Sequence, residues 1–82
     1  MKVADRSRLY ESFGSRLKRI RLSKGLTPTE MFYRSGVDGS NLRKYENGLR
    51  DPGLAIIMIL AKALGVDHRV LTDFDFDFEE TV

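Results

Sequence analysis

The sequence contains no cysteine and only one histidine among its 82 residues. Without cysteine the chain can form neither a disulfide nor a cysteine-ligated zinc site, so its stability must come from packing or from oligomerisation. A single histidine also leaves little from which to build a nucleophile with its base, and we expect no catalytic activity. His68 stands alone near a predicted helix start, which is typical of a surface residue, so we expect no metal and no cofactor.

Long apolar runs are also missing. The longest, residues 54–61, is far shorter than the roughly 18 residues that a membrane-spanning helix needs. It lies in the middle of the chain, where no signal peptide occurs. We therefore expect a soluble, cytoplasmic protein without a membrane partner. The length fits one domain over residues 9–74, with an N-terminal extension over residues 1–8 and an acidic, aromatic tail over residues 75–82.

The net charge of +2 conceals an asymmetry between the two parts of the chain. Residues 1–50 carry twelve Lys and Arg against five Asp and Glu, whereas residues 51–82 carry two against seven. A basic front half indicates a polyanionic partner, although a solvated charged surface would have the same composition.

Helical periodicity and glycine stops predict five helices. Phe13, Leu17 and Ile20 recur at helical spacing and predict an amphipathic helix from about residue 9 to residue 24, which Gly25 ends. The remaining helices are predicted over residues 28–35, 39–46, 54–64 and 67–73. We therefore expect a compact all-α fold.

Two of these helix starts have strong capping signals. Thr27 and Glu30 can form a capping box around Pro28, which suits the first helical position. Asp38 can cap the next helix. Gly36 stands where a tight turn between the two helices needs positive φ. A short helix, a glycine turn and a second helix are thus predicted over residues 27–46.

The chain end has a different pattern. Aspartate and phenylalanine alternate from residue 73 to residue 78, and this period of two predicts an extended segment. Phe74, Phe76 and Phe78 would share one face of it. Pairing with a second copy would bury these rings, and a frayed terminus is the alternative.

A helix pair with a polar and basic outer face can place its second helix in the major groove of DNA. Within the helix predicted over residues 39–46, Ser40, Asn41 and Lys44 can meet base edges, whose donor and acceptor patterns differ in that groove. Four other side chains are better placed to hold phosphates: Arg19, Arg43, Asn47 and Arg50.

The order of residues from Phe13 to about Phe74 resembles the Cro and phage-repressor-like helix-turn-helix regulators, also called the xenobiotic-response-element type. The residues that carry the resemblance are residues 16–21, Gly25-Leu26-Thr27, Glu30-Met31, Gly36-Val37, Tyr45-Glu46-Asn47-Gly48, Arg50, Pro52 and residues 60–66. It implies a five-helix lambda-repressor-like domain that binds DNA through its third helix. It also implies base contacts at Gly39, Ser40 and Lys44, phosphate contacts at Thr27 and Asn47, and an ion pair between Arg21 and Glu46 that orients the third helix.

Three residues depart from this family's pattern. Pro28 replaces a glutamine that commonly contacts phosphate, so only backbone amides at this helix start can serve. Phe32 replaces a small residue that lets the two helices approach, and Ser35, one turn later, could make room for it. Gly39 removes a side chain from a base-contacting position, which predicts either narrow sequence specificity or recognition of DNA shape.

The helix predicted over residues 54–64 is apolar almost all round. Leu54, Ile57, Leu60, Ala61 and Leu64 suffice for one buried face. Ile56, Met58 and Ile59 then remain as surplus apolar surface, which usually marks a contact site. We expect a twofold homodimer that buries these residues together with Phe74 and Phe76. The alternative is that the tail folds back over them.

Taken together, these features predict a homodimeric transcription regulator, most simply a repressor, that binds double-stranded DNA at a roughly palindromic operator. Two alternatives stay open. The fold could serve as a protein-interaction module, such as an antitoxin or adaptor, whose apolar helix holds a protein partner. It could also serve as a controller of a restriction-modification system, which differs in gene context and not in chemistry.

Overall fold

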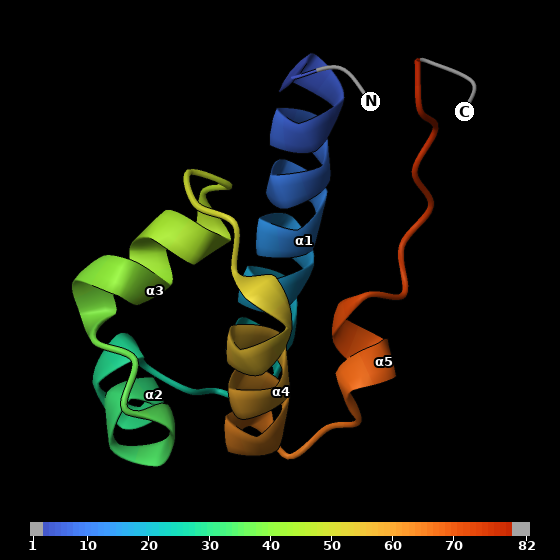
Figure 1. Ribbon diagram of the computed structural model, residues 1–82. Helices are drawn as coiled ribbons and strands as arrows, with labels where there is room; N and C mark the ends of the chain where they lie inside the picture. The colour runs from blue at the N-terminus through green and yellow to red at the C-terminus, as the bar shows by residue number, and fades with distance from the viewer. Residues whose placement is uncertain (1–2, 80–82) are drawn as a thin grey trace.

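The computed structural model describes residues 3–79, in which five helices and no strand occur. The helices are α1 (Val3–Ser23), α2 (Pro28–Ser35), α3 (Gly39–Glu46), α4 (Gly53–Leu64) and α5 (His68–Leu71). Figure 1 shows α1 as the long central helix, with α2 and α3 on one side and α5 on the other. The predicted all-α, five-helix fold is confirmed. Residues 1–2 and 80–82 lie outside the described residues. The predicted N-terminal extension (residues 1–8) and the predicted tail (residues 75–82) are therefore described only in part.

The boundaries of α2 and α3 follow from local chemistry. The Thr27 hydroxyl accepts a hydrogen bond from the Glu30 amide, and the Glu30 carboxylate accepts one from the Thr27 amide, which completes the predicted capping box. Gly36 ends α2 with φ of 76°, a left-handed conformation that costs glycine little. Asp38 then caps α3 by accepting from the Asn41 amide at 2.8 Å.

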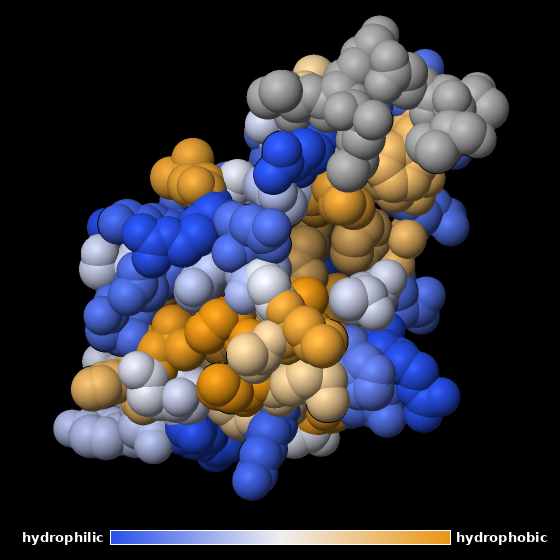
Figure 2. All heavy atoms as spheres, viewed as in Figure 1, coloured by the Kyte–Doolittle hydropathy of each residue, from blue (hydrophilic) through white to orange (hydrophobic). Residues whose placement is uncertain are grey.

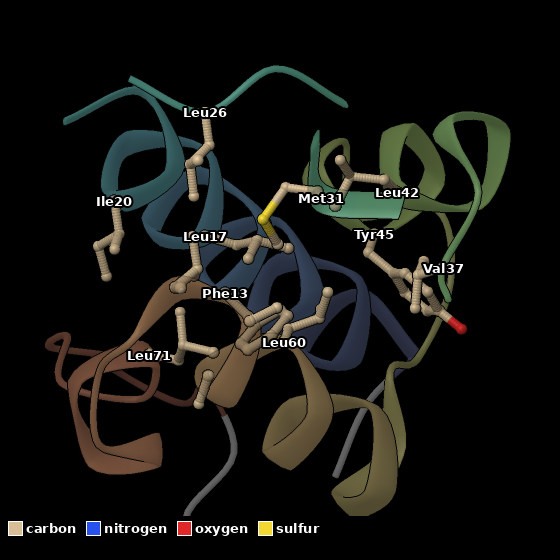
Figure 3. Close-up of a cluster of buried hydrophobic side chains, with 13 residues drawn as sticks. Phe13, Leu17, Ile20, Leu26, Met31, Val37, Leu42, Tyr45, Leu60 and Leu71 are labelled. Atoms are coloured by element: carbon tan, nitrogen blue, oxygen red, sulfur yellow. The ribbon is translucent and has the colours of Figure 1, made fainter. Parts of the chain in front are cut away.

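One hydrophobic core joins all five helices (Figure 3). From α1, Leu17 is completely buried, and Met31 of α2, Leu60 of α4 and Leu71 of α5 are equally inaccessible. Leu42 of α3 is 1% exposed, so the helix that is predicted to meet DNA is anchored from beneath. Within residues 3–79, no helix is both long and apolar enough to cross a membrane.

Helix α1 begins at Val3, six residues earlier than its apolar periodicity predicts. Residues 3–8 are therefore the first turns of α1 and not a separate extension. The apolar stripe of the core does not reach this part of the helix, which explains why periodicity missed it. Tertiary contacts with the end of the chain hold it instead: Asp5 is fully buried and accepts a hydrogen bond from the Glu79 amide, and Arg8 donates to the Asp77 carbonyl.

The buried face of α4 agrees with the expectation except at its first turn. Leu54, predicted to be buried, is 75% exposed, whereas Ile56 and Ile57 are partly buried against the core. Ala61, seven residues after Leu54 and on the same face of the helix, is buried, so Leu54 is exposed because it lies in the first turn of α4 and not because the helix is rotated. The buried face is therefore formed by Leu60, Ala61, Ala63 and Leu64.

Residues 73–79, hereafter the tail segment, run back along α1 toward its amino-terminal end (Figure 1). Phe74 and Phe76 line an apolar depression together with Leu9, Phe13 and Ile57. The tail segment is extended but forms no strand within the described residues, and α5 ends at Leu71, earlier than the predicted residue 73. The tail therefore packs on α1 of its own chain and leaves Met58 and Ile59 uncovered.

Phe32 does not force the two helices of the pair apart. Its ring is 43% exposed and stacks on Tyr33, with the ring centroids 5.9 Å apart. Ser35 makes no space for it: its hydroxyl donates to the Met31 carbonyl and accepts from the Val37 amide, which stabilises the turn. The large side chain is accommodated because it lies at the surface.

Candidate nucleic-acid interface

The outward face of α3 is polar and basic. Leu42 and Tyr45 anchor the helix in the core, and this leaves the opposite side to Ser40, Arg43 and Lys44, all of which are exposed. Gly39, the first residue of α3, is half-buried and carries no side chain. The structure thus places Ser40 and Lys44 where base edges in a major groove could be reached.

Asn47, the C-cap of α3, lines a depression between α3 and α1 together with Arg43. Lys18 of α1 lines the same depression, next to Pro28 at the start of α2. Lys18 was not among the predicted phosphate-binding residues. Its helical spacing from Arg21, three residues later on the same face of α1, is the sequence signal that could have identified it.

Arg19 lies elsewhere. It lines a depression with Arg8 and Arg16, against the aspartates of the tail segment. The reason is the helical rotation of about 100° per residue, which turns Arg19 away from the face that carries Lys18. The predicted phosphate contact at Arg19 is therefore not supported, because Arg19 is not brought to the α3 surface.

Thr27 uses its polar groups within its own chain. Its hydroxyl and its amide both contact the Glu30 carboxylate, at 3.0 and 3.1 Å. Hydrogen bonds from the Thr27 backbone and hydroxyl lower the pKa of the Glu30 carboxyl. The capping box thus places a carboxylate at the start of α2, where the family pattern implies a phosphate contact, and Pro28 offers no amide proton.

Asn41 and Arg50 are joined. One Arg50 Nη donates to the side-chain oxygen of Asn41 at 2.6 Å, and the Asn41 side-chain nitrogen donates to Asp38 at 3.2 Å. Arg50 belongs to the loop between α3 and α4 and is exposed, whereas Asn41 is half-buried. A residue predicted to contact bases is therefore hydrogen-bonded to one predicted to contact phosphate.

The ion pair implied between Arg21 and Glu46 is present in the structure. The guanidinium donates to both carboxylate oxygens, at 2.6 and 3.1 Å, and to the Leu26 carbonyl at 2.7 Å. Both side chains are less than 10% exposed. Gly14 lets α1 approach the same end of α3, since a Cβ there would lie 2.4 Å from the carbonyl oxygens of Tyr45 and Glu46.

A second exposed surface lies on α4. Leu54, Met58 and Ile59 are 75%, 44% and 41% exposed, and Figure 2 shows hydrophobic side chains gathered over this part of the molecule. We call these three residues the α4 apolar face. Of the other residues expected at a dimer interface, Ile56 is half-buried, and Phe74 and Phe76 pack on their own chain.

The described residues offer little for metal binding. His68 lies 3.6 Å from Asp67 at the surface, and no group of three or more His, Cys, Asp or Glu side chains is placed to hold an ion within residues 3–79. The chemistry available at the α3 surface is therefore hydrogen bonding and positive charge.

Comparisons with known proteins agree with this geometry. A helix-turn-helix family model matches residues 17–71. An uncharacterized HTH-type transcriptional regulator, y4dJ of Sinorhizobium fredii, is 44% identical over 55 residues, which cover 67% of this chain and 71% of the relative. YonR, an uncharacterized prophage-derived HTH-type transcriptional regulator of Bacillus subtilis, is 37% identical over 71 residues, covering 83% of this chain and 66% of the relative.

Among solved structures, the restriction-modification controller protein C.AhdI from Aeromonas hydrophila superposes with a TM-score of 0.73 at 37% sequence identity. The match covers 76% of this chain and 94% of the controller. The family model spans the described core from Leu17 of α1 to Leu71 of α5, including α2, α3 and the turn between them. The chain belongs to the Cro/C1-type helix-turn-helix family of DNA-binding transcriptional regulators.

Proposed function

We propose that this regulator acts as a cytoplasmic homodimer that represses transcription by occupying a roughly palindromic operator. In each protomer α3 enters the major groove, and the two copies of α3 lie one helical turn, about 34 Å, apart. The observation that carries the proposal is the outward face of α3, which is polar and basic while its other side is anchored by Leu42 and Tyr45.

Ser40 and Lys44 contact base edges, because both are exposed on this face. Gly39 contributes no side chain, so recognition at its position relies on DNA shape. Arg43, Asn47 and Lys18 hold phosphates from the depression between α1 and α3. Phosphate contacts fix the register on the duplex, and the base contacts supply the sequence preference.

The α4 apolar face supports the dimer. An exposed leucine, methionine and isoleucine on one helix of a small domain form surface that is more stable when buried. A twofold contact of α4 with α4 of a second copy buries it on both protomers at once. The tail segment is not needed for this contact, because its phenylalanines pack within the chain.

Selection of bound sequences from a random DNA pool tests the proposal. We expect an enriched sequence with twofold symmetry. Lys44→Ala should weaken binding to that sequence far more than binding to random DNA, whereas Arg6→Ala, which removes a positive charge from the start of α1, should not change this ratio. Equal losses for Lys44→Ala would assign Lys44 to phosphate. The absence of an enriched palindrome would favour a protein-interaction module, whose apolar contacts, unlike phosphate contacts, would resist salt.

A controller of a restriction-modification system is the second candidate, favoured by the structural match to such a controller over 76% of the chain. Both candidates bind DNA in the same way, so the position of the operator separates them. Under this second candidate the selected sequence would lie upstream of genes for a restriction endonuclease or its methyltransferase. Its occurrence only before unrelated genes would exclude the controller role.

A further inference from the structure

The side-chain amide of Asn41 is held at both ends by its own chain. Its oxygen accepts from Arg50 at 2.6 Å, and its nitrogen donates to Asp38 at 3.2 Å. An asparagine that recognises adenine uses its oxygen and its nitrogen together. Each group keeps one lone pair or one N–H, but the half-buried amide is held by Arg50 and Asp38 and cannot turn its edge to a base pair without breaking these contacts.

Arg50 is in the opposite situation. It is exposed in the loop after α3, and within residues 3–79 its side chain makes no ion pair and no hydrogen bond other than the one to Asn41. A guanidinium carries five N–H donors, so most of its donors remain free, including a pair that can hold a phosphate with two parallel hydrogen bonds.

The link between the two residues keeps the Arg50 side chain against the first turn of α3. A free arginine side chain loses considerable rotamer entropy when it binds, and a guanidinium that is already held in place loses less. Asp38 extends the chain of contacts, because its carboxylate both caps α3 and holds the Asn41 nitrogen. The position of the guanidinium is thereby tied to the helix that enters the groove.

We propose that Asn41 is a positioning residue that holds Arg50 ready to bind a DNA phosphate beside α3, and that Asn41 itself does not contact bases. The inference rests on the proposed DNA binding by α3 and assigns roles within it. Arg50 makes the phosphate contact, and Asn41 acts only through Arg50.

The salt dependence of DNA binding separates these roles. Each phosphate that a protein neutralises contributes about 0.9 to the slope of log K against log salt concentration. Arg50→Ala should therefore reduce the slope by about 0.9. Asn41→Ala exchanges one neutral side chain for another, yet it should also make the slope less steep, because Arg50 is no longer held in place. It should lower the affinity about fivefold, and equally on the operator and on random DNA.

The double variant completes the test. Because Asn41 acts only through Arg50, Asn41→Ala combined with Arg50→Ala should bind no more weakly than Arg50→Ala alone. Ser40→Ala is the contrasting variant: it removes a base contact and should lower the operator affinity, but it should leave the slope unchanged because no phosphate contact is lost. Circular dichroism of each variant checks that α3 is intact, since the Asp38 cap to the Asn41 amide does not need the Asn41 side chain.

Four results would overturn the inference: an unchanged slope for Arg50→Ala, an unchanged slope for Asn41→Ala, additive losses in the double variant, or an Asn41→Ala loss confined to one base pair. The last result would restore Asn41 as a base-contacting residue. An unchanged slope for Arg50→Ala would remove the phosphate contact. In each of these cases the wild-type protein still binds its operator, so the proposed function stands. A wild-type protein that selects no DNA sequence would contradict both the proposed function and this inference.

Discussion

Arg21 of α1 and Glu46 at the end of α3 face each other through two hydrogen bonds, of 2.6 and 3.1 Å, in a place where both side chains are almost fully buried. The third nitrogen of the Arg21 guanidinium, Nη1, donates to the Leu26 carbonyl in the segment before α2. One guanidinium therefore ties together α1, the start of the helix pair and the end of α3. Desolvation offsets most of the attraction in such a pair, so its main effect is on the orientation of α3.

Removing one member of this pair should cost more than replacing both. Glu46→Ala leaves the Arg21 charge buried without its partner, and we expect the free energy of unfolding to fall by about 3 kcal/mol. The double variant Arg21→Met with Glu46→Leu should lose much less, since apolar side chains of similar size tolerate burial. Urea denaturation measures both values. Equal losses in the two variants would show that the charges themselves supply the stability.

The contact between α1 and α3 at Gly14 allows no side chain. A Cβ at this position would lie 2.4 Å from two backbone carbonyl oxygens, and backbone cannot move aside as a flexible side chain can. Gly14→Ala should therefore destabilise the domain by about 3 kcal/mol.

Gly39→Ala is the matched control. Its Cβ would meet only the Cβ of Pro28, at an ordinary contact distance of 3.8 Å, and its φ is not positive. We expect a gain of about 0.5 kcal/mol, because alanine restricts the unfolded chain. Thermal unfolding of both variants checks the pair, and a Gly39→Ala variant as unstable as Gly14→Ala would contradict the assigned packing.

Local chemistry accounts for what the sequence could predict. Thr27, Gly36 and Asp38 act within a few residues of themselves, so the limits of α2 and α3 followed from capping and turn preferences alone. The family resemblance added the pairing of Arg21 with Glu46, which lie 25 residues apart.

What sequence reasoning missed depends on how the helices are rotated and what packs on them. Lys18 and Arg19 are neighbours of equal charge, and the spacing of Lys18 from Arg21 identifies the face of α1 that lines the depression only once α1 is known to pack on α3 through Arg21. The first turns of α1 have no apolar stripe of their own and are held by the tail segment, a contact across more than sixty positions. The link between Asn41 and Arg50 depends on the path of the loop after α3.

Asp67 at the start of α5 should titrate far below a normal aspartate. The side-chain hydrogen bond from Arg69, followed by the one from the Arg69 backbone, lowers the pKa of Asp67 from 3.8 to about 2. A carboxyl whose folded pKa is depressed stabilises the fold above its unfolded pKa, and this stabilisation disappears as the pH falls from 3.8 toward 2.

The pH titration of the Asp67 carboxyl carbon by NMR measures this value. Arg69→Ala should raise the pKa toward 3.8 without reaching it, because the backbone N–H of residue 69 still donates to the carboxylate. A titration that is the same in both proteins would show that Arg69 is not bound to Asp67 in solution.

Arg8 should hold the tail segment on α1. Its guanidinium lies over the Phe76 ring, 5.0 Å from the centroid, and donates to the Asp77 carbonyl at 3.2 Å. The Glu79 amide, which donates to Asp5, reports whether the tail segment is docked. Because an exposed cation–π contact is worth up to about 1 kcal/mol, Arg8→Ala should speed hydrogen exchange of that amide about fivefold.

Arg6→Ala is the control for this measurement, since Arg6 lies on the same part of α1 and its side chain donates a hydrogen bond to Tyr10 and none to the tail segment within the described residues. It should leave the exchange of the Glu79 amide unchanged, and amides of α4 should exchange at wild-type rates in both variants. Equal exchange of the Glu79 amide in Arg8→Ala and Arg6→Ala would show that Arg8 does not hold the tail segment.

The α4 apolar face should decide the oligomeric state. Ile59 is 41% exposed, so Ile59→Asp adds a charge at a position that already meets water in the monomer and should leave the fold intact. In a dimer that buries this face, two such charges would meet without partners, and we expect sedimentation to show monomers.

Leu22→Asp is the control, because Leu22 is 57% exposed on α1, outside the α4 apolar face. A dimer that survives Ile59→Asp would place the interface elsewhere. A monomer should also bind the operator with the affinity of a single half-site, because the two copies of α3 are then no longer held together.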